Sequence, residues 1–407
     1  MARQSTIVRR DCGDGAANKS SDKPATLRQS ERANTPTKTN GPRRLAKQLP
    51  LPYGCYYAEG DQLFGIQNKN LSVYQPSHNA NWLRVLRGVV SALLKVSPYM
   101  MRDGPELFED FIRVHSKVYS SKAEKAKRFD IFLQNLKDIN DLNSKHEYAE
   151  FGITKFSDLT RDEFLKRYSC LIPQSDHADH CRHSDNFRNE NDEVAIPSEF
   201  DWRQKNVVTQ VKDQGACGSC WAFSVTGNVE SINAIKTGQL LLLSEQQLVD
   251  CDKGNMGCNG GYQNVAIQYF KNQGAMSATS YPYTAIDGNC KYNAEQVVVN
   301  VTDCLKIQTA KEDDIAEQLV KIGPLSISID ASSLMNYQKG IINGQSCSGF
   351  ELNHAVLLVG YGTDNGLPYW LVKNSWGGFG EKGYFRMQRG VNCLNFMNDA
   401  AYSAVVG

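Results

Sequence analysis

Apolar residues recur at helical spacing in several parts of the chain. After Ser219 the apolar positions are Trp221, Ala222, Phe223, Val225, Val229, Ile232 and Ile235. Because an α-helix repeats every 3.6 residues, this spacing predicts a helix with one apolar side. Ser219 is its predicted N-cap, which places Cys220 in the first turn. Two more helices are predicted, one from Ser244 to Cys251 with Ser244 and Gln247 as a capping-box pair, and one over 262–271.

The last hundred residues favour strands instead. Short apolar runs separated by glycine-rich turns lie at Leu325–Ile329, Ala355–Val359, Tyr369–Val372 and Tyr384–Met387. A helix-rich segment over 200–300 is thus followed by a strand-rich one over 300–407. This order predicts the α+β class, with a helical lobe beside an antiparallel β-barrel lobe and a cleft between them.

The residues before 196 divide into segments of different character. Two amphipathic helices are expected, one beginning with Phe108, Phe111 and Ile112, and one with an apolar face of Phe129, Phe132, Leu133, Leu136 and Ile139. Residues 1–104 are predicted to be an N-terminal extension that is largely disordered, because residues 1–48 are rich in Lys, Arg, Ser, Thr, Pro and Asn. Residues 169–195 are polar and without periodicity, as expected of a linker.

Composition and charge exclude several classes of protein. With 407 residues, 41% hydrophobic content and a formal net charge of +1, the chain has room for more than one core. The neutral balance argues against nucleic acid as a partner. No stretch of about 18 uncharged apolar residues exists, so no membrane span is predicted. Residues 82–96 come nearest and are interpreted as a degenerate secretion signal, interrupted by Arg84, Arg87 and Lys95.

The residue types needed for thiol chemistry occur around the predicted helix. The positive end of a helix dipole favours a thiolate, the reactive form of cysteine, at the position of Cys220. A proton-transfer partner is also needed, and six of the seven histidines lie at or before His183, which leaves His354 for the C-terminal part. His354 precedes one predicted strand, and Asn374 follows another and could hold the ring through its far N–H.

These residues carry a resemblance to a known family. The run from Cys217 to Trp221, Cys-Gly-Ser-Cys-Trp, is the local signature of papain and cathepsin-type cysteine proteases, in which His and Asn follow about 130–150 residues later. The resemblance extends over about 105–407, and the sequence of residues 352–362 is most similar to baculovirus-type viral cathepsins. It implies a papain-like cysteine endopeptidase that acts on protein or peptide substrates, as a monomer and without a cofactor or metal.

The resemblance also implies the residue roles. Cys220 would be the nucleophile, His354 the proton-transfer group, Asn374 its orienting partner, and Gln214 an oxyanion donor together with the Cys220 N–H. Substrate would pair with the backbone of Gly260 and Gly261, while Trp376 would shield the His–Asn hydrogen bond. Tyr262, Ser328 and Leu352 would line the second subsite, with Asn398 or Asp399 at its floor. An acid there would admit arginine, and the expected preference is hydrophobic with arginine tolerated.

Residues 105–165 resemble an α-helical inhibitory propeptide. Six residues match the interspersed motif of cathepsin L-type propeptides, namely Glu124, Arg128, Phe132, Asn135, Ile139 and Asn143. Gly152, Phe156 and Asp158 resemble a second motif, with Thr154 where the family usually has Asn. The resemblance implies a zymogen whose propeptide lies backwards in the cleft, a cleavable linker over 166–195 cut near 194–196, and a peptidase domain over 196–407. Asp158 and a Glu124–Arg128 pair would make this contact acid-labile.

The cysteines imply an oxidising compartment. The resemblance pairs Cys217 with Cys258, Cys251 with Cys290, and Cys347 with Cys393, and leaves Cys220 and Cys304 unpaired, with Cys304 as a small buried apolar residue. Around Cys393 the family has Cys followed by Gly where this chain has Leu394, so either the cysteine is displaced or the loop is reshaped. Three bridges indicate the secretory route, to a lysosome-like or extracellular compartment. A glycosylation sequon begins at Asn300.

The same residues allow other interpretations. A redox or zinc pair formed by Cys217 and Cys220 lacks a matching second pair and would consume the nucleophile. His177, His180, Cys181 and His183 could bind a metal, but no second ligand cluster fixes a geometry, which favours a solvated linker. A catalytically silent binding or inhibitory homologue is disfavoured because none of the four catalytic-type residues is substituted. A thiol acyltransferase or peptide ligase is disfavoured by the protease-type propeptide and cysteine set.

Overall fold

The computed structural model describes residues 55–59, 62–67, 70–74, 98–169, 181–183, 196–347, 349 and 351–407. The predictions of a disordered N-terminus and of a degenerate signal over 82–96 fall largely or wholly outside these residues, as do His177 and His180. The chain divides into two compact units, residues 1–95 and 96–407. In the first unit, strands β1 (Cys55–Glu59), β2 (Gln62–Gln67) and β3 (Asn70–Tyr74) form an antiparallel sheet in sequence order, which the sequence analysis did not predict.

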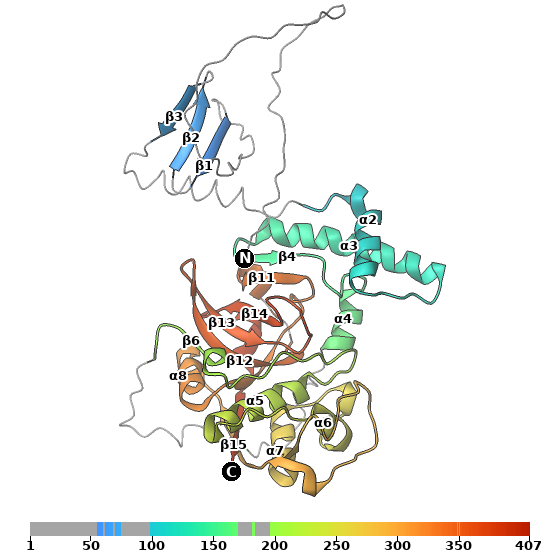
Figure 1. The fold of residues 1–407 in the computed structure, drawn as a ribbon, viewed down its shortest axis with the longest axis vertical. Coiled ribbons are helices and arrows are strands. Elements are labelled where there is room, and N and C mark those ends of the chain that lie inside the picture. The colour runs from blue at the N-terminus through green and yellow to red at the C-terminus, as the bar shows by residue number, and fades with distance from the viewer. Residues whose placement is uncertain are drawn as a thin grey trace, which may run out of the picture. The chain divides into compact units, whose positions relative to one another are not determined.

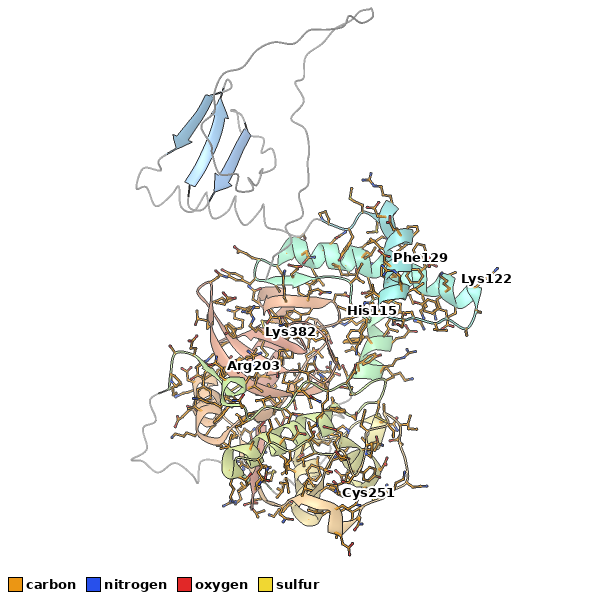
Figure 2. All side chains as sticks on the ribbon, viewed as in Figure 1. His115, Lys122, Phe129, Arg203, Cys251 and Lys382 are labelled. Atoms are coloured by element: carbon orange, nitrogen blue, oxygen red, sulfur yellow. A yellow bond between two sulfur atoms is a disulfide. The ribbon has the colours of Figure 1, made fainter. Side chains whose placement is uncertain are left out.

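The second unit begins with the predicted propeptide-like helices. They are the short 3₁₀ helix η1 (Met101–Asp103), α2 (Gly104–Val114), α3 (Lys122–Lys145), the strand β4 (Ala149–Phe151) and α4 (Arg161–Tyr168). Figure 2 shows Phe129 among the side chains packed between α2 and α3, where its ring lies 5.2 Å from that of Phe108. Thr160 begins α4 with a capping box that includes Glu163, which satisfies two otherwise unpaired backbone N–H groups.

The helical part follows at residues 200–300. Its elements are β6 (Phe200–Asp201), η3 (Trp202–Lys205), α5 (Cys220–Thr237), α6 (Glu245–Cys251), η4 (Gly257–Asn259), α7 (Gln263–Gln273), β7 (Ala275–Met276), η5 (Ala294–Gln296) and β8 (Val297–Val299). The three helices α5, α6 and α7 begin within one residue of the predicted positions. Two predicted caps are only partly right. The Ser219 side chain does not cap α5, and Ser244 accepts from the Gln247 N–H while the Gln247 side chain bonds elsewhere.

The strand-rich part completes one large sheet. Its further elements are β9 (Val301–Ile307), α8 (Glu312–Ile322), β10 (Leu325–Ile329), β11 (Tyr337–Ile342), η6 (Gly344–Cys347), β12 (His354–Asp364), β13 (Leu367–Lys373), β14 (Tyr384–Gln388), η7 (Cys393–Asn398) and β15 (Ala401–Val406). The strand order is β4-β11-β14-β13-β12-β10-β15-β9-β5, where β5 is Arg182–His183, and β6 also pairs with β12.

The sheet is mixed, whereas an antiparallel one was expected. Most pairs are antiparallel, but β11 pairs with β14 and β5 with β9 in parallel. The four predicted strands correspond to β10, β12, β13 and β14. Helix α8, with Ile315, Ala316 and Leu319 buried at helical spacing, was not predicted within this strand-rich part. The α+β class itself is confirmed.

Apolar side chains form two main cores, one in each of the two predicted lobes. In one, α5 and α7 pack with β9 and β15. In the other, propeptide residues such as Phe132, Phe156 and Phe164 join the side chains of β10–β14. In Figure 1, α2 and α3 (cyan) lie on one side of the orange-red strands and α5, α6 and α7 on the other. The propeptide segment is therefore part of the β-lobe core.

Four disulfides are present among the described residues. They are Cys217–Cys258, Cys251–Cys290 and Cys347–Cys393, the three pairs implied by the family resemblance, and Cys181–Cys304. The expectation that Cys304 is an unpaired buried residue was therefore wrong. Cys181, interpreted as part of a solvated linker, is buried beside β9, while its neighbour His183 is exposed.

Candidate active site

Cys220 is the first residue of α5 and is completely buried. The backbone N–H groups of Ala222 and Phe223 bond to the Ser219 carbonyl, so the helix starts at the expected place although the Ser219 hydroxyl contacts Tyr283 instead. The Cys220 Sγ accepts a 3.4 Å hydrogen bond from the backbone N–H of Ala355, the second residue of β12. The thiol thus faces the start of the strand on which His354 lies.

His354 is held by two residues that follow β13. Its Nε2–H donates to Asn374 Oδ1 over 2.9 Å, because an amide oxygen can only accept. The imidazole stacks on the Trp376 ring, with centroids 4.6 Å apart and planes inclined by 25°. His354 Nδ1 is buried and makes no hydrogen bond within the described part of the chain. That nitrogen is therefore left for proton exchange with a neighbouring group.

Gln214 lies on the loop that precedes α5 and is fixed from both ends of its amide. Its Oε1 accepts from Ser375 Oγ over 2.6 Å, and its Nε2 donates to the Cys217 carbonyl over 3.0 Å. The Gln214 N–H bonds to the Ser375 carbonyl, and the Ser375 N–H bonds to Asn374 Oδ1. Ser375, which the sequence analysis missed, therefore connects the amide of Gln214 to that of Asn374.

The Gly260–Gly261 loop lies directly beside the start of α5. The disulfide Cys217–Cys258 and a 2.8 Å bond from the Gly218 N–H to the Cys258 carbonyl connect the two segments. A Cβ atom on Gly261 would lie 2.7 Å from the Trp221 ring, so a side chain there would force the loop away. The loop is further held by Asn255, which bonds to both backbone groups of Tyr262 and to Asp252. Burial raises the pKa of Asp252 to about 6.

The residues predicted for the second subsite lie around β10 and the segment after η7. Ser328 Oγ donates to Asp399 Oδ2 over 2.8 Å and accepts from the Gln263 amide, at the start of α7 beside Tyr262. Asn398 instead is exposed and bonds to Asn392. The two candidates for the floor of the subsite therefore lie in different places, and Asp399 is the one that contacts Ser328. Leu352, half-buried, lies two residues before His354.

The loop near this subsite is reshaped where the family has glycine. Cys393 keeps its bridge to Cys347, and the next residue, Leu394, has φ of 58°. This left-handed conformation favours glycine and costs a residue with a Cβ atom about 1 kcal/mol or more. Leu394 is nevertheless buried, and its carbonyl accepts from the Asp330 N–H. Burial of the leucine side chain offsets the backbone cost.

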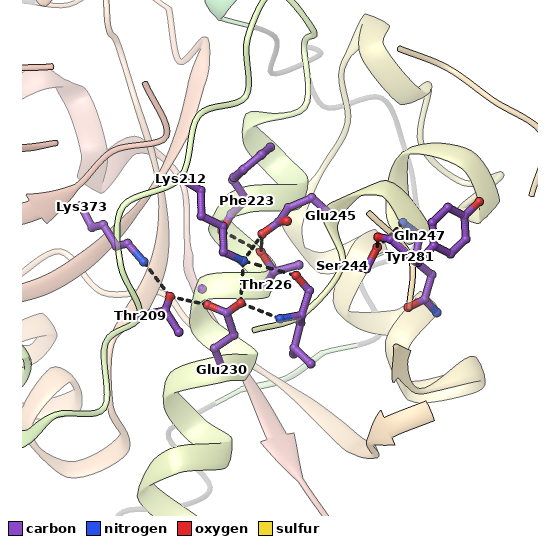
Figure 3. Close-up of polar contacts among 12 residues, drawn as sticks. Thr209, Lys212, Phe223, Thr226, Glu230, Ser244, Glu245, Gln247, Tyr281 and Lys373 are labelled. Carbon is purple, nitrogen blue, oxygen red and sulfur yellow. Dashed lines mark hydrogen bonds and ion pairs between the residues drawn. The ribbon is translucent and has the colours of Figure 1, made fainter. Parts of the chain in front are cut away.

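A buried ionic cluster includes Lys373, the residue before Asn374 in the chain (Figure 3). The Lys212 ammonium lies 2.6 Å from Glu230 Oε1 and 2.5 Å from Glu245 Oε1, on α5 and α6. Burial opposes the charge of Lys212, but the two carboxylates outweigh it and raise its pKa. Lys373, adjacent to Asn374, donates to Thr209, which donates to Glu230. Burial lowers the pKa of Lys373 to about 8.

The motif residues of α3 hold the segment that leads to the active site. Arg128 donates to Glu163 Oε2 and to the Asp158 carbonyl, and Asn135 donates to the carbonyls of Ser157 and Leu159. The expected Glu124–Arg128 pair was wrong, because Glu124 instead bonds to Ser120. Asp158 accepts from Lys117 and Tyr119. The bond to Arg128, above all, lowers the pKa of Glu163 to about 2.

The same segment covers the site. Strand β4 pairs antiparallel with β11, and the Phe156 and Phe164 rings lie 5.5 and 5.3 Å from that of Trp376, in edge-on contact. At the end of α4 the Tyr168 carbonyl accepts from Gln214 Nε2 over 3.4 Å. A backbone carbonyl of the propeptide segment therefore already contacts the proposed oxyanion donor.

Within the described segments, no group of three or more His, Cys, Asp or Glu residues is placed to hold a metal ion. The helices of those segments are also too short or too polar to cross a bilayer.

A thiol at a helix N-terminus, next to the start of the strand that carries an Asn-held histidine and covered by a helical segment, is typical of a thiol-protease zymogen. Residues 196–405 match the model of the papain family cysteine proteases, and residues 108–164 match the cathepsin propeptide inhibitor domain. The chain belongs to the papain family of cysteine proteases, and it is a cysteine endopeptidase with a propeptide.

Individual relatives agree with this assignment. The chain is 41% identical over 332 residues to the viral cathepsin of Choristoneura fumiferana nuclear polyhedrosis virus, covering 79% of this chain and 98% of the relative. It is 43% identical to that of Antheraea pernyi nuclear polyhedrosis virus, covering 76% and 94%. Among solved structures, a digestive procathepsin L from the larval midgut of Tenebrio molitor has a TM-score of 0.65 at 35% identity, covering 74% of this chain and 98% of that one. A recombinant stem bromelain precursor has a TM-score of 0.67 at 36% identity, covering 74% and 98%.

Proposed function

We propose that Cys220, His354, Asn374 and Gln214 carry the peptidase reaction. The observation that supports this most is the placement of the buried Cys220 thiol against the start of β12, where Asn374 holds the His354 ring. Helix α5 directs its positive end at the sulfur, which favours the thiolate, and His354 Nδ1 takes the proton. The resting pair is then a thiolate and an imidazolium.

The reaction proceeds in two steps. The thiolate attacks the peptide carbonyl carbon to form a C–S bond, and the Gln214 amide and the Cys220 N–H stabilise the oxyanion. His354 gives its proton to the leaving amine as the C–N bond breaks. His354 then takes a proton from water, the hydroxide attacks the acyl-enzyme, and the carboxylic acid leaves as the C–S bond breaks. Asn374 and Trp376 keep the imidazole oriented in both steps.

The reaction can be tested on acid-treated protein with an epoxide thiol inhibitor and a fluorogenic dipeptide amide. The unmodified chain is expected to be labelled at Cys220 and to release the fluorophore, whereas Cys220→Ser does neither and the exposed-surface variant Ser280→Ala does both. A catalytically silent homologue would show neither labelling nor cleavage. A peptide ligase would transfer the acyl group to added amines in preference to water. Either result would reject the proposed hydrolysis.

We further propose that Asp399 sets the preference of the second subsite. Its carboxylate accepts from Ser328 Oγ, which also accepts from the Gln263 amide beside Tyr262, so an acid lies at the group of residues expected to line this subsite. A hydrophobic residue is preferred in the substrate and arginine is tolerated. Asp399→Asn is expected to lower kcat/KM for an arginine substrate about tenfold or more and to leave that for a phenylalanine substrate within about twofold. Equal losses for both substrates would contradict this role.

We infer that the propeptide is the enzyme's own inhibitor and that acid weakens it. Burial lowers the pKa of His146, which contacts Ser346 of the peptidase part, while Asn343 and Asp141 oppose this shift and Lys145 adds to it. A depressed histidine pKa gives stability above pH 6.5 that is lost as the pH falls below it. Glu163 loses its stabilisation only between about pH 4.5 and pH 2. His146 therefore fits mild acid better than Glu163 does.

The route and state of the protein follow as part of the same proposal. Four disulfides among the described residues fit an oxidising compartment of the secretory route, leading to a lysosome-like or extracellular site. Asn300 is exposed and can accept an N-glycan there. A mass shift on glycosidase treatment that is absent in Asn300→Gln would support this route. The proposed state is a monomer, which sedimentation would test.

A further inference from the structure

The disulfide between Cys181 and Cys304 joins two parts of the chain that maturation is expected to separate. Cys304 lies in β9 of the peptidase part, while Cys181 precedes the expected cut near 194–196. Both cysteines are buried, among apolar residues of α5, α7, β9 and β15. The bridge is therefore part of the helical-lobe core and is shielded from solvent.

Noncovalent contacts hold the same segment to β9. Arg182 and His183 form β5, which pairs in parallel with Leu305 and Lys306 and ends the large sheet. Arg182 also pairs with Asp303, which Lys271 contacts from α7. The segment 181–183 is thus attached to the peptidase part by a covalent bond, a strand pair and an ion pair. The segment itself precedes the expected cut, so the cut alone does not release it.

The other end of the linker lies at the active site. Tyr168, the last residue of α4, bonds through its carbonyl to Gln214, and Cys181 follows it by 13 positions. A chain of that length spans at most about 45 Å, even when fully extended. A propeptide that leaves the site while this connection is intact therefore stays within reach of it.

We propose that the Cys181–Cys304 bridge keeps the propeptide attached after the chain is cut near 194–196, so that this cut alone leaves the enzyme latent. Activity then needs a second cut between Tyr168 and Cys181, after which a peptide containing Cys181 remains bound as a small second chain of the mature enzyme. A short tether gives an effective concentration in the millimolar range, so rebinding outcompetes dilution. This inference rests on the proposed inhibition by the propeptide and on the proposed site of maturation.

The attachment can be measured without catalysis. In Cys220→Ser, which does not process itself, the recognition site of a sequence-specific protease replaces residues 186–191, and the protein is cut there at pH 7.5. Under denaturing, non-reducing conditions the two fragments are expected to migrate as one species and to separate after reduction. Separation without reduction would overturn the proposal. The matched control, with Cys181→Ser and Cys304→Ser, is expected to separate without reduction.

The latency is measured with Cys220 intact and the same engineered cut. The bridged protein is expected to stay inactive over a thousandfold dilution, whereas the double serine variant gains about tenfold or more in specific activity as its propeptide dissociates. An equal gain in both would overturn the tether. If neither protein becomes active even after acid processing, the proposed peptidase reaction fails instead, while the fragment result still stands.

A third measurement needs no variant of the bridge. The intact mass of the acid-processed natural protein is expected to fall on reduction by the mass of one peptide that contains Cys181. A change of only the few daltons expected for reduced intrachain bridges would overturn the retained second chain.

Discussion

At the scale of single residues, the active site depends on how amide groups are oriented. The Ser375 hydroxyl donates to Gln214 Oε1, which turns the Gln214 NH₂ toward the Cys217 and Tyr168 carbonyls. The Asn374 oxygen in turn accepts from both His354 and the Ser375 N–H. Ser375 therefore contacts the side-chain amides of both Gln214 and Asn374. These contacts preorganise the site before a substrate binds.

Removing the Gln214 amide should slow the chemical step. Gln214→Ala is expected to lower kcat by about 10²–10³ with little change in KM, because the oxyanion forms only in the transition state. Steady-state kinetics with the dipeptide amide would measure this, with Gln239→Ala at an exposed glutamine as the unchanged control. A loss confined to KM would indicate that Gln214 binds substrate rather than stabilising the oxyanion.

His146 should set the pH at which the propeptide is released. Its ring is buried against Phe151 and lies 2.6 Å from Ser346 Oγ, so a charge there is costly. His146→Gln keeps a hydrogen-bonding group but cannot titrate, and is expected to shift the midpoint of release below that of the natural chain. Release is measured as the onset of activity between pH 7 and pH 4.

The natural chain and the His146→Gln variant should be equally inhibited by the propeptide near pH 7.5, where His146 is neutral. His183→Gln, at an exposed position on β5, is the matched control and should leave the midpoint unchanged. An unshifted midpoint in His146→Gln would assign the acid response to other groups.

At the scale of elements, α5 carries both the proposed nucleophile and part of the buried ionic cluster. Its first residue is Cys220, and its buried face carries Glu230 into the ionic cluster with Lys212, Thr209 and the backbone of Leu243. A fully buried glutamate on an apolar helix is costly unless it is paired. The cluster therefore connects α5, which carries the proposed nucleophile, to the loop of Lys212 and, through Thr209, to Lys373 beside Asn374.

Neutralising Glu230 should be strongly destabilising. Glu230→Gln leaves the buried Lys212 and Lys373 with less compensating charge, which is expected to cost about 3–5 kcal/mol in the free energy of unfolding. Chemical denaturation of the proenzyme would measure it. Glu317→Gln, in a surface pair with Lys321, should change the same quantity by only about 0.5 kcal/mol. Similar effects of both changes would contradict a special role for the cluster.

Elements with strong local patterns were predictable from the sequence, and those defined by long-range contacts were not. The α5 helix follows from its apolar spacing, and β10 from its alternation of apolar residues with serines. The Cys181–Cys304 bridge joins residues 123 positions apart, and no local pattern distinguishes it from other pairings. Glu230 within an apolar helix was a signal of a buried polar group, but its partners on Lys212 and Thr209 come from another segment. Ser375 was missed because its role depends on Gln214, 161 positions away.

At the scale of the whole second unit, the propeptide completes the β-lobe. Phe151, Phe156 and Phe164 are fully buried in the same core as Trp370 and Trp376. Burying one such side chain stabilises a fold by about 1.5–3 kcal/mol. The propeptide is thus held by the same apolar contacts that stabilise the domain it covers.

The proenzyme should consequently unfold at a higher temperature than the processed enzyme at neutral pH. Calorimetry of the Cys220→Ser chain before and after an engineered cut between Tyr168 and Cys181 and removal of the propeptide would measure the difference, with the uncut chain carried through the same steps as control. A processed form that melts at the same temperature would show that these aromatic contacts stabilise docking alone.

The ten-stranded sheet begins with β4 and ends with β5, and neither strand belongs to residues 196–407. When the propeptide departs, β4 leaves and the backbone N–H and C=O groups along one side of β11 lose their partners. An unpaired edge strand of this kind can accept an extended segment from another chain. The opposite edge of the sheet differs, since the bridge to Cys304 would keep β5 paired beside β9. Loss of the propeptide would thus leave a sheet with one edge open along β11, and with the other edge still paired through β5 at Leu305 and Lys306.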